Sequence, residues 1–503
     1  MFADFFAGFT LLFQWSVLLA NIVGIIIGTL IGAIPGLGPT IAVAILIPVT
    51  FFLPIVPSMM LLLGVYQAGI YGGSISAILF NIPGVPGAAA TVFDGFPMAK
   101  QGRGGKALKI ALFSSAFGNA FSCLVLLVVA APLAAVALRF GPPEIAALIL
   151  LALTVISAVS GRSMLKGLLV GLLGLLFSTV GLDPIWGTVR LTWGEPQLEG
   201  GFTLIPFLIG LFAISELLVQ SGRLDPVLDM EKARTRKSGP SHLSKDNHVS
   251  FLEMWRMRGI MLWSALIGIF IGILPGIGST TPAFMSYALA RQRSKNPEMF
   301  GKGALEGVAA PETANNAVTG GALIPLLSLG IPGDAVTAVI LGAFMLQGLT
   351  PGPFLFRDHG PEVYAILFGL ILSTIPTLIV GLILLRYAVK VLKLRRSTIF
   401  PVVLVMCVIG SFSVNNSLVD VGVMFAFGFI GYACRLSGYP LPPLLIGFIL
   451  GKTFEEAMRQ SLLLSQGSLM VFIQRPIAVG FLILSVIVLI SSIRLSRRMY
   501  MGN

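Results

Sequence analysis

Charged side chains are scarce in this sequence. Of its 503 residues, 11% are Asp, Glu, Lys or Arg, whereas 56% are hydrophobic. Soluble domains carry about 25% charged residues. This shortage excludes an ordinary soluble domain, and the composition is that of a polytopic membrane protein.

Cysteine and histidine are rarer still. The three cysteines lie in apolar runs, so the sequence predicts neither a disulfide framework nor a metal site. The three histidines lie in polar loops, which excludes an intramembrane histidine cluster. No Walker-type glycine loop is present, and Asp334, the one hint of an intramembrane aspartyl protease, follows the helix breaker Pro332. We therefore expect no enzyme activity and no cofactor.

The net charge of +12 has two interpretations. In a soluble protein, a basic excess would suggest a nucleic-acid partner. In a membrane protein, basic residues mark cytoplasmic loops, and we favour this interpretation, so no nucleic-acid partner is expected. The first residues, MFADFF, contain no basic residue. This argues against a cleaved signal peptide and predicts that the first apolar run stays as a membrane helix.

Apolar runs that can span or enter a bilayer recur along the whole chain. Those at 39–56, 280–290 and 335–349 are shorter than the roughly 20 residues that a full span needs, so we expect half-helices or re-entrant segments there. The expected fold is an all-α polytopic membrane protein with about ten to twelve transmembrane helices plus re-entrant or broken helices.

A polar, basic stretch at residues 221–258 divides the chain and predicts a cytoplasmic linker. The expected domains are a first repeat over 1–220, this linker, and a second repeat over 259–475. An extra transmembrane helix with a basic cytoplasmic tail follows over 476–503.

The two halves share a motif. Gly28–Thr40 reads GTLIGAIPGLGPT, and Gly268–Thr281 reads GIFIGILPGIGSTT. Proline removes an amide donor and glycine frees the backbone, so each apolar helix breaks at Pro-Gly-x-Gly and restarts. Ile82-Pro83-Gly84 recurs as Ile331-Pro332-Gly333, which makes the repeat collinear. A broken helix in each half is the best sequence pointer to a transporter's binding site.

Loop charges predict that the two repeats are inverted. Four basic residues lie between 100 and 109, after the first Ile-Pro-Gly, whereas its counterpart 345–361 has only Arg357. Conversely, basic residues follow the second broken helix, and 50–58 after the first carries no charge. Under the positive-inside rule, corresponding loops lie on opposite sides, with the N-terminus outside and the C-terminus inside.

The helix ends at the two breaks are candidate anion sites. A helix N-terminus exposes unpaired amides and a partial positive charge, which suits a carboxylate. The alternative is a small-residue packing face with a proline kink. The candidate substrate ligands here are Gly36, Gly38, Thr40, Gly276, Gly278, Ser279, Thr280 and Thr281.

Polar residues inside apolar stretches form a second candidate set. Such groups are costly at membrane depth unless they face partners or a water-filled cavity. Interhelical hydrogen bonds, and a helix cap for Glu312, are the structural alternatives. The candidate substrate ligands are Ser74, Ser76, Asn81, Asn315 and Asn316, and the coupling-ion candidates are Asn81, Pro83, Glu312, Asn316 and Pro332.

Four stretches resemble the large membrane subunit of the tripartite tricarboxylate transporters, the TctA family. They are the glycine motif near the start, YGGSISAILFNIPG followed by DGFPMAKQGR, GLFAISELL, and APETANNAVTGGALIPLLSLGIPGDA. The resemblance extends along nearly the whole chain.

The resemblance implies a carrier of the bacterial inner membrane. Its partners would be a small membrane subunit (TctB-like) and a periplasmic solute-binding protein (TctC-like) that delivers the substrate. It implies secondary uptake of citrate-like tricarboxylates, or of di- or aromatic carboxylates, driven by a Na⁺ or H⁺ gradient. It also implies an elevator-like architecture, in which a mobile domain with 28–95 and 268–349 moves against a scaffold. The scaffold would hold the long helices near 107–138 and 362–394. A passive carboxylate channel or exporter is the alternative function.

Two physical points refine this expectation. Import of an anion against an inside-negative potential costs about 2.3 kcal/mol per charge per 100 mV, so a cation site is expected near the anion site. Pro39 stands where the second copy has Ser279, which removes one hydroxyl and one amide from the first break. Ligation is therefore expected to depend more on the second half.

Overall fold

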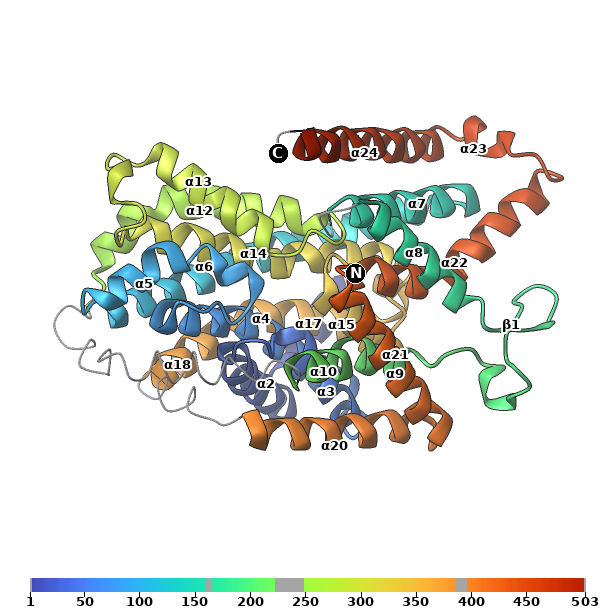
Figure 1. Ribbon diagram of the computed structural model, residues 1–503, viewed down its shortest axis with the longest axis horizontal. Helices are drawn as coiled ribbons and strands as arrows, with labels where there is room; N and C mark the ends of the chain where they lie inside the picture. Colours follow the sequence, from blue (N-terminus) through green and yellow to red (C-terminus); the bar gives the residue numbers. More distant parts are fainter. Residues whose placement is uncertain (1, 160–163, 222–247, 386–395, 502–503) are drawn as a thin grey trace. The chain divides into compact units, whose positions relative to one another are not determined.

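A computed structural model describes residues 2–159, 164–221, 248–385 and 396–501 (Figure 1). In these ranges the protein is helical apart from two short strands, β1 (Gly181–Leu182) and β2 (Val189–Arg190), which pair antiparallel. Seven of the described helices are long and apolar enough to cross a membrane, and shorter apolar helices accompany them. The predicted all-α polytopic fold is confirmed. The inverted orientation and the elevator-like movement stay predictions.

The helices form two compact units, and each unit takes segments from both halves of the chain. Unit 1 comprises Met1–Pro132, Val219–Ile273 and Gly278–Met406. Unit 2 comprises Leu133–Leu218, Leu274–Ile277 and Cys407–Asn503. The long helices near 107–138 and 362–394, which the resemblance puts in a separate scaffold, lie mostly in unit 1 with the broken helices.

The elements of unit 1 are these: α1 (Phe2–Leu12), α2 (Trp15–Ala33), α3 (Pro39–Thr50), α4 (Ile55–Phe80), η1 (Pro86–Ala89), α5 (Val92–Lys100), most of α6 (Gly104–Ala137), the end of α10 (Ser215–Ser221), α12 (Phe251–Ile273), α13 (Thr280–Arg293), η5 (Pro297–Met299), α14 (Glu306–Leu329), α15 (Ala335–Leu346), α16 (Leu355–Asp358), α17 (Gly360–Leu372), α18 (Thr374–Leu385) and the start of α20 (Arg396–Asn415).

Unit 2 holds the remaining elements. They are the end of α6, α7 (Pro142–Val159), α8 (Met164–Ser178), the two strands, η2 (Pro196–Leu198), α9 (Leu204–Leu208), η3 (Ile209–Ile214), the start of α10, the end of α20, α21 (Leu418–Leu436), α22 (Leu441–Leu464), α23 (Met470–Gln474) and α24 (Pro476–Met501).

Both predicted helix breaks are present. α2 ends at Ala33 and α3 begins at Pro39, while α12 ends at Ile273 and α13 begins at Thr280. Gly36, Gly276 and Gly278 have φ angles of 90°, 79° and 67°, a left-handed backbone that glycine adopts without steric cost. The predicted short helices are α3, α13 and α15. Their few turns follow from the proline and glycine residues that bound them.

Two helix boundaries differ from the sequence prediction. The first apolar run is interrupted, because α1 ends at Leu12 and α2 begins at Trp15. The linker predicted over 221–258 is shorter on its C-terminal side, because 251–258 already belong to α12. The basic residues at 251–258 lie on a helix, so the linker boundary predicted from charge was wrong at this end. Residues 222–247 of the linker lie outside the described residues.

Small residues let α2 lie directly on α4, and α12 directly on α14. A Cβ on Gly28 of α2 would stand 2.5 Å from the carbonyl oxygen of Val65 in α4. A Cβ on Gly268 of α12 would stand 2.4 Å from the carbonyl oxygen of Ala314 in α14. Val65 and Ala314 each lie 17 residues before the Ile-Pro-Gly motif of their copy. The packing interpretation of these glycines is therefore correct, and the two copies share it.

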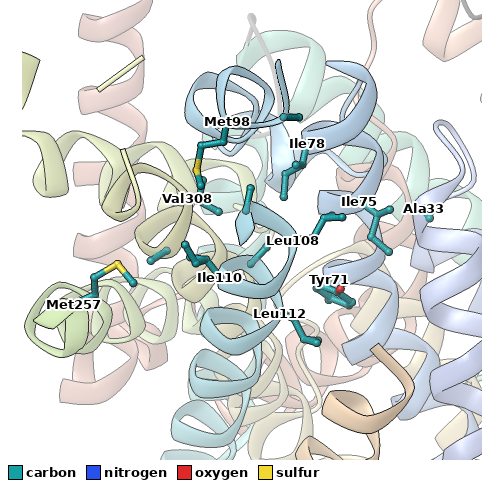
Figure 2. Close-up of a cluster of buried hydrophobic side chains, with 14 of the residues drawn as sticks. Ala33, Tyr71, Ile75, Ile78, Met98, Leu108, Ile110, Leu112, Met257 and Val308 are labelled. Carbon is teal, nitrogen blue, oxygen red and sulfur yellow. The ribbon is translucent and has the colours of Figure 1, made fainter. Parts of the chain in front are cut away.

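The core of unit 1 joins helices from both halves. Figure 2 shows Tyr71 and Ile78 of α4, Leu108 of α6, Met257 of α12 and Val308 of α14 in one buried cluster. Their burial against one another holds the two repeats together as one body.

In unit 2, ion pairs hold the β1–β2 hairpin to α22. Asp183 accepts hydrogen bonds from Arg459, and Arg190 donates to Glu455. The backbone amide of Trp186 and the Arg459 guanidinium hold the pKa of Asp183 down at about 2, despite partial desolvation. The carboxylate therefore stays ionised, and the cluster intact, throughout the neutral and mildly acidic range.

Asp94 anchors the loop that precedes α14. Its Oδ1 accepts hydrogen bonds from the amides of Gly301, Gly303 and Ala304 at 2.8–2.9 Å, and its Oδ2 accepts one from the Tyr287 hydroxyl. A carboxylate with four donors has a structural role here. It fixes α5 against the start of α14.

We expect Asp94→Ala to destabilise the protein, because it leaves three loop amides without an acceptor. Each buried unpaired amide costs roughly 1–3 kcal/mol. The melting temperature of the detergent-solubilised chain, followed by loss of monodisperse protein on heating, should fall by at least about 5 °C. Asp358→Ala is the control, since Asp358 is exposed and pairs with its neighbour Arg357. Equal melting of both variants would contradict the anchoring role.

Candidate functional site

The N-terminus of α13 is one side of the candidate site. Ser279 is the N-cap residue, and its hydroxyl caps no backbone amide of the helix. Pro282, in the third position, has no amide hydrogen, so this helix end presents the amides of Thr280 and Thr281. Ser279 and Thr280 are half-buried and Thr281 is exposed. The helix end can thus donate hydrogen bonds to an anion.

A buried amide side chain faces this helix end. Asn315 of α14 is fully buried, and within the described part of the chain neither its Nδ2 nor its Oδ1 has a hydrogen-bond partner. A Cβ built on Gly87 of η1 would stand 2.1 Å from Asn315 Oδ1 and 2.4 Å from Ser279 Oγ. The two side chains therefore converge on Gly87. An unpartnered buried amide is costly, which makes this cluster a candidate ligand site.

The segment 86–95 runs antiparallel along α14 and contacts a second polar residue of that helix, Glu312. Thr91 donates a hydrogen bond to Glu312 Oε1 at 2.5 Å. Thr91 lies four residues after Gly87 in the segment, and Glu312 lies three residues before Asn315 in α14. Ser115 of α6 donates to Glu312 Oε2 at 3.1 Å. Glu312 is fully buried. The predicted substrate and coupling-ion residues of α14 are thus neighbours on one helix face.

Asn316 continues the network toward α6. Its Nδ2 donates to Ser115 Oγ at 2.8 Å and to the Glu312 carbonyl oxygen at 3.0 Å. Thr319, one turn further, donates to Asn119 Oδ1. Asn316 therefore has interhelical partners, unlike its neighbour Asn315.

Four residues of this network were not predicted from the sequence: Gly87, Thr91, Ser115 and Asn119. For Ser115 and Asn119 the sequence does contain a pattern that could have indicated them. Ser115, Asn119 and Ser122 recur at helical spacing in the apolar run of α6, so they mark one polar face. Gly87 and Thr91 carry no such pattern, because their role depends on the neighbours that the fold supplies.

The first break is equipped differently. Gln220 of α10 donates through Nε2 to the carbonyl oxygen of Gly36 at 2.8 Å. A Cβ added to Gly38 would have Val85 Cγ1 as its nearest neighbour, at 3.7 Å, and Thr40 is half-buried in the first turn of α3. By contrast, an equivalent Cβ on Gly278 in the second break would meet nothing within 4 Å. The Gln220 side chain lies against Gly36, whereas the equivalent Gly276 lies against the apolar side chain of Ile156.

The first-copy counterpart of Asn315 is already paired. Tyr66 lies 16 residues before Ile82, as Asn315 lies 16 before Ile331. The Tyr66 hydroxyl donates to Asp334 Oδ2 at 2.7 Å, and Asp334 also caps α15 through Thr337. A carboxylate at this place repels a second carboxylate. The first copy thus has a hydroxyl paired with a carboxylate where the second copy has an unpartnered amide.

The remaining predicted residues lie apart from the cluster. Ser74 and Ser76 donate to carbonyls of their own helix, α4. Asn81 is exposed and ends α4 with a φ of 62°, as Gly330 ends α14 with 72°, so it is a helix C-cap. Pro83 and Pro332 lie in the turns that follow. Among the described residues no hydrogen bond joins these three residues to Glu312 or Asn316.

Comparison with known proteins finds a family model that matches most of the chain. Residues 18–446 match the family model described as "Tripartite tricarboxylate transporter TctA family". The chain is 38% identical over 486 residues to an uncharacterized 52.8 kDa protein in the TAR-I ttuC' 3'region of Agrobacterium vitis, which covers 96% of this chain and 93% of that protein. A protein in the TAR-II ttuC' 3'region is 39% identical over 46% of this chain and 97% of its own length. No solved structure matches.

Gly87→Ala should weaken anion binding at the cluster, because the added methyl would overlap the side chains of Asn315 and Ser279. We expect the affinity of the purified chain for radiolabelled citrate, measured by equilibrium binding, to fall at least tenfold. Gly38→Ala is the matched control, since its methyl would fit beside Val85 at 3.7 Å. Unchanged binding by Gly87→Ala, or equal loss in both variants, would show that the cluster is not the site.

Proposed function

The chain belongs to the tripartite tricarboxylate transporter TctA family, and on that premise we propose that it is an importer of small carboxylates. It is the large membrane subunit and takes its substrate from a periplasmic solute-binding protein. A small membrane subunit completes the carrier in the bacterial inner membrane. The substrate is a tricarboxylate such as citrate, or a related di- or aromatic carboxylate.

The single observation that supports this function best is the unpartnered Asn315 beside the N-terminus of α13. A carboxylate placed there accepts hydrogen bonds from Asn315 Nδ2, from the Ser279 hydroxyl and from the amides of Thr280 and Thr281. These donors are all neutral. Recognition by neutral donors binds the carboxylate without a fixed positive charge, so the anion can leave again on the other side.

Uptake is driven by an ion gradient. An anion moving into an inside-negative cell gains electrical energy, so each negative charge must be matched by a co-transported Na⁺ or H⁺. The orientation that loop charges predict, with a periplasmic N-terminus and a cytoplasmic C-terminus, belongs to the same proposal. So do the inverted repeats, which would expose one site alternately to the two sides.

A passive carboxylate channel or exporter is the alternative. The same polar cluster would then line a path rather than form an occluded site. The two functions differ in what they require. A channel conducts down the substrate gradient without a binding protein, whereas the proposed carrier accumulates substrate only with its partners and an ion gradient.

Reconstitution into liposomes tests the function. With both partners present, the chain should accumulate citrate, succinate or benzoate only under an inward Na⁺ or H⁺ gradient. Asn315→Ala should lower the initial rate at least tenfold, because it removes the buried donor. Ser286→Ala is the matched control, since Ser286 is also buried and unpartnered but lies inside α13. Equal flux without binding protein or gradient would establish the channel instead.

A further inference from the structure

Glu312 is a buried carboxylate whose hydrogen-bond partners are neutral. Its side chain is fully buried in α14, and its two oxygens accept hydrogen bonds from the hydroxyls of Thr91 and Ser115. Among the described residues it forms no ion pair with a basic side chain. An ionised carboxylate in such surroundings is very costly unless it is paired or takes up a proton.

We propose that the coupling ion of this carrier is a proton, and that Glu312 binds it next to the substrate site. This inference rests on the proposed function and adds the identity of the ion and the group that carries it.

The hydrogen bonds around Glu312 favour a proton over a sodium ion. Ser115 Oγ accepts a hydrogen bond from Asn316 Nδ2, so its own hydrogen is directed to Glu312. The carbonyl oxygen of Glu312 also accepts from Asn316. A sodium ion needs several oxygen lone pairs that point at it. Ser115 Oγ, which already accepts from Asn316 and donates to Glu312, has one lone pair left to offer such an ion.

The network can take up one proton without rebuilding. When a proton forms an O–H bond at Glu312 Oε1, the carboxylate becomes a neutral acid and can donate to Thr91 Oγ1. The Thr91 hydroxyl, which rotates freely about its Cβ–Oγ bond, then changes from donor to acceptor. Ser115 keeps its bond to Oε2. One proton enters and one negative charge disappears, and the hydrogen bond between Thr91 and Glu312 is kept with its direction reversed.

Among the groups around Glu312, Glu312 itself is the one that can take up the proton. From α4, Tyr71 is the titratable neighbour, and its buried hydroxyl has no partner among the described residues. The α6 helix contributes Ser115, and the segment 86–95 contributes Thr91; neither titrates near neutral pH. Asp94, on the same segment, is held by the loop 301–304 and Tyr287. Glu312 is thus the carboxylate of this network that lacks a charged or amide donor.

The position of Glu312 explains how proton and substrate are coupled. Glu312 lies one helical turn from Asn315, and Thr91 lies four residues after Gly87. A substrate carboxylate beside Asn315 is repelled by an ionised Glu312 and not by a protonated one. Each ligand therefore favours the other, and by linkage the effect is reciprocal. Proton and anion bind and leave together, which is symport.

Glu312→Gln in the complete carrier tests the proposal, because glutamine imitates the neutral acid but cannot release a proton. In proteoliposomes, citrate uptake driven by an inward proton gradient should fall at least tenfold, while exchange of external for internal citrate continues. Glu306→Gln is the matched control on the same helix, at a half-buried position, and should keep both activities. Proton-driven accumulation by Glu312→Gln, or wild-type uptake driven by a sodium gradient alone, would overturn the proposal.

Infrared spectroscopy supplies a readout that does not depend on transport. The wild-type chain at neutral pH should show the C=O band of a protonated carboxyl group that Glu312→Gln lacks and Glu306→Gln retains. If the wild type transports no carboxylate, the proposed function fails and the proton site is judged by this band. If the band is identical in all three proteins, Glu312 is not the proton carrier, whatever is transported.

Discussion

The contact between the segment 86–95 and α14 is the interaction on which the rest of the candidate site depends. Gly87 admits Asn315, Thr91 binds Glu312, and Asp94 binds the loop that leads into α14. The three contacts follow one another along two antiparallel segments. One segment belongs to the first half of the sequence and the other to the second half. Asp94 fixes the end of this contact that lies at the start of α14.

The two repeats share a backbone plan but differ in what their breaks present. Packing of α2 on α4 repeats as packing of α12 on α14, with glycines at equivalent positions. At the first break, however, Gln220 donates to the Gly36 carbonyl oxygen, and the Tyr66 hydroxyl donates to Asp334, so this carbonyl and this hydroxyl have partners within the protein. At the second, Asn315 is left unpartnered beside Ser279. The two breaks are similar in backbone, and the proposed anion site depends on the side chains in which they differ.

A carrier for an anion must bind its substrate without holding it permanently. Neutral donors at the N-terminus of α13 and at Asn315 meet this requirement, because they stabilise a carboxylate less than a fixed cation would. The buried carboxylate at Glu312 adds a condition to the same site. An anion is tolerated there only when that carboxylate is neutral, so the charge that the donors do not balance is balanced by a proton.

The sequence by itself determined the membrane class, the two helix breaks, the short helices α3, α13 and α15, and the duplication. Each of these depends on local chemistry: hydropathy over a helix length, and the backbone effects of proline and glycine. It also pointed to Ser279, Asn315 and Glu312. It did not tell Asn315 from Asn316, or Glu312 from Asp94 and Asp334, because these residues differ only in their partners. Asn316 and Glu312 are hydrogen-bonded to Ser115 and Thr91, which lie more than 190 residues away in the sequence. Gly87, which has no side chain, leaves room for the side chain of Asn315. Only the tertiary structure brings such distant residues together, so only it decided which polar groups are satisfied and which remain for a ligand.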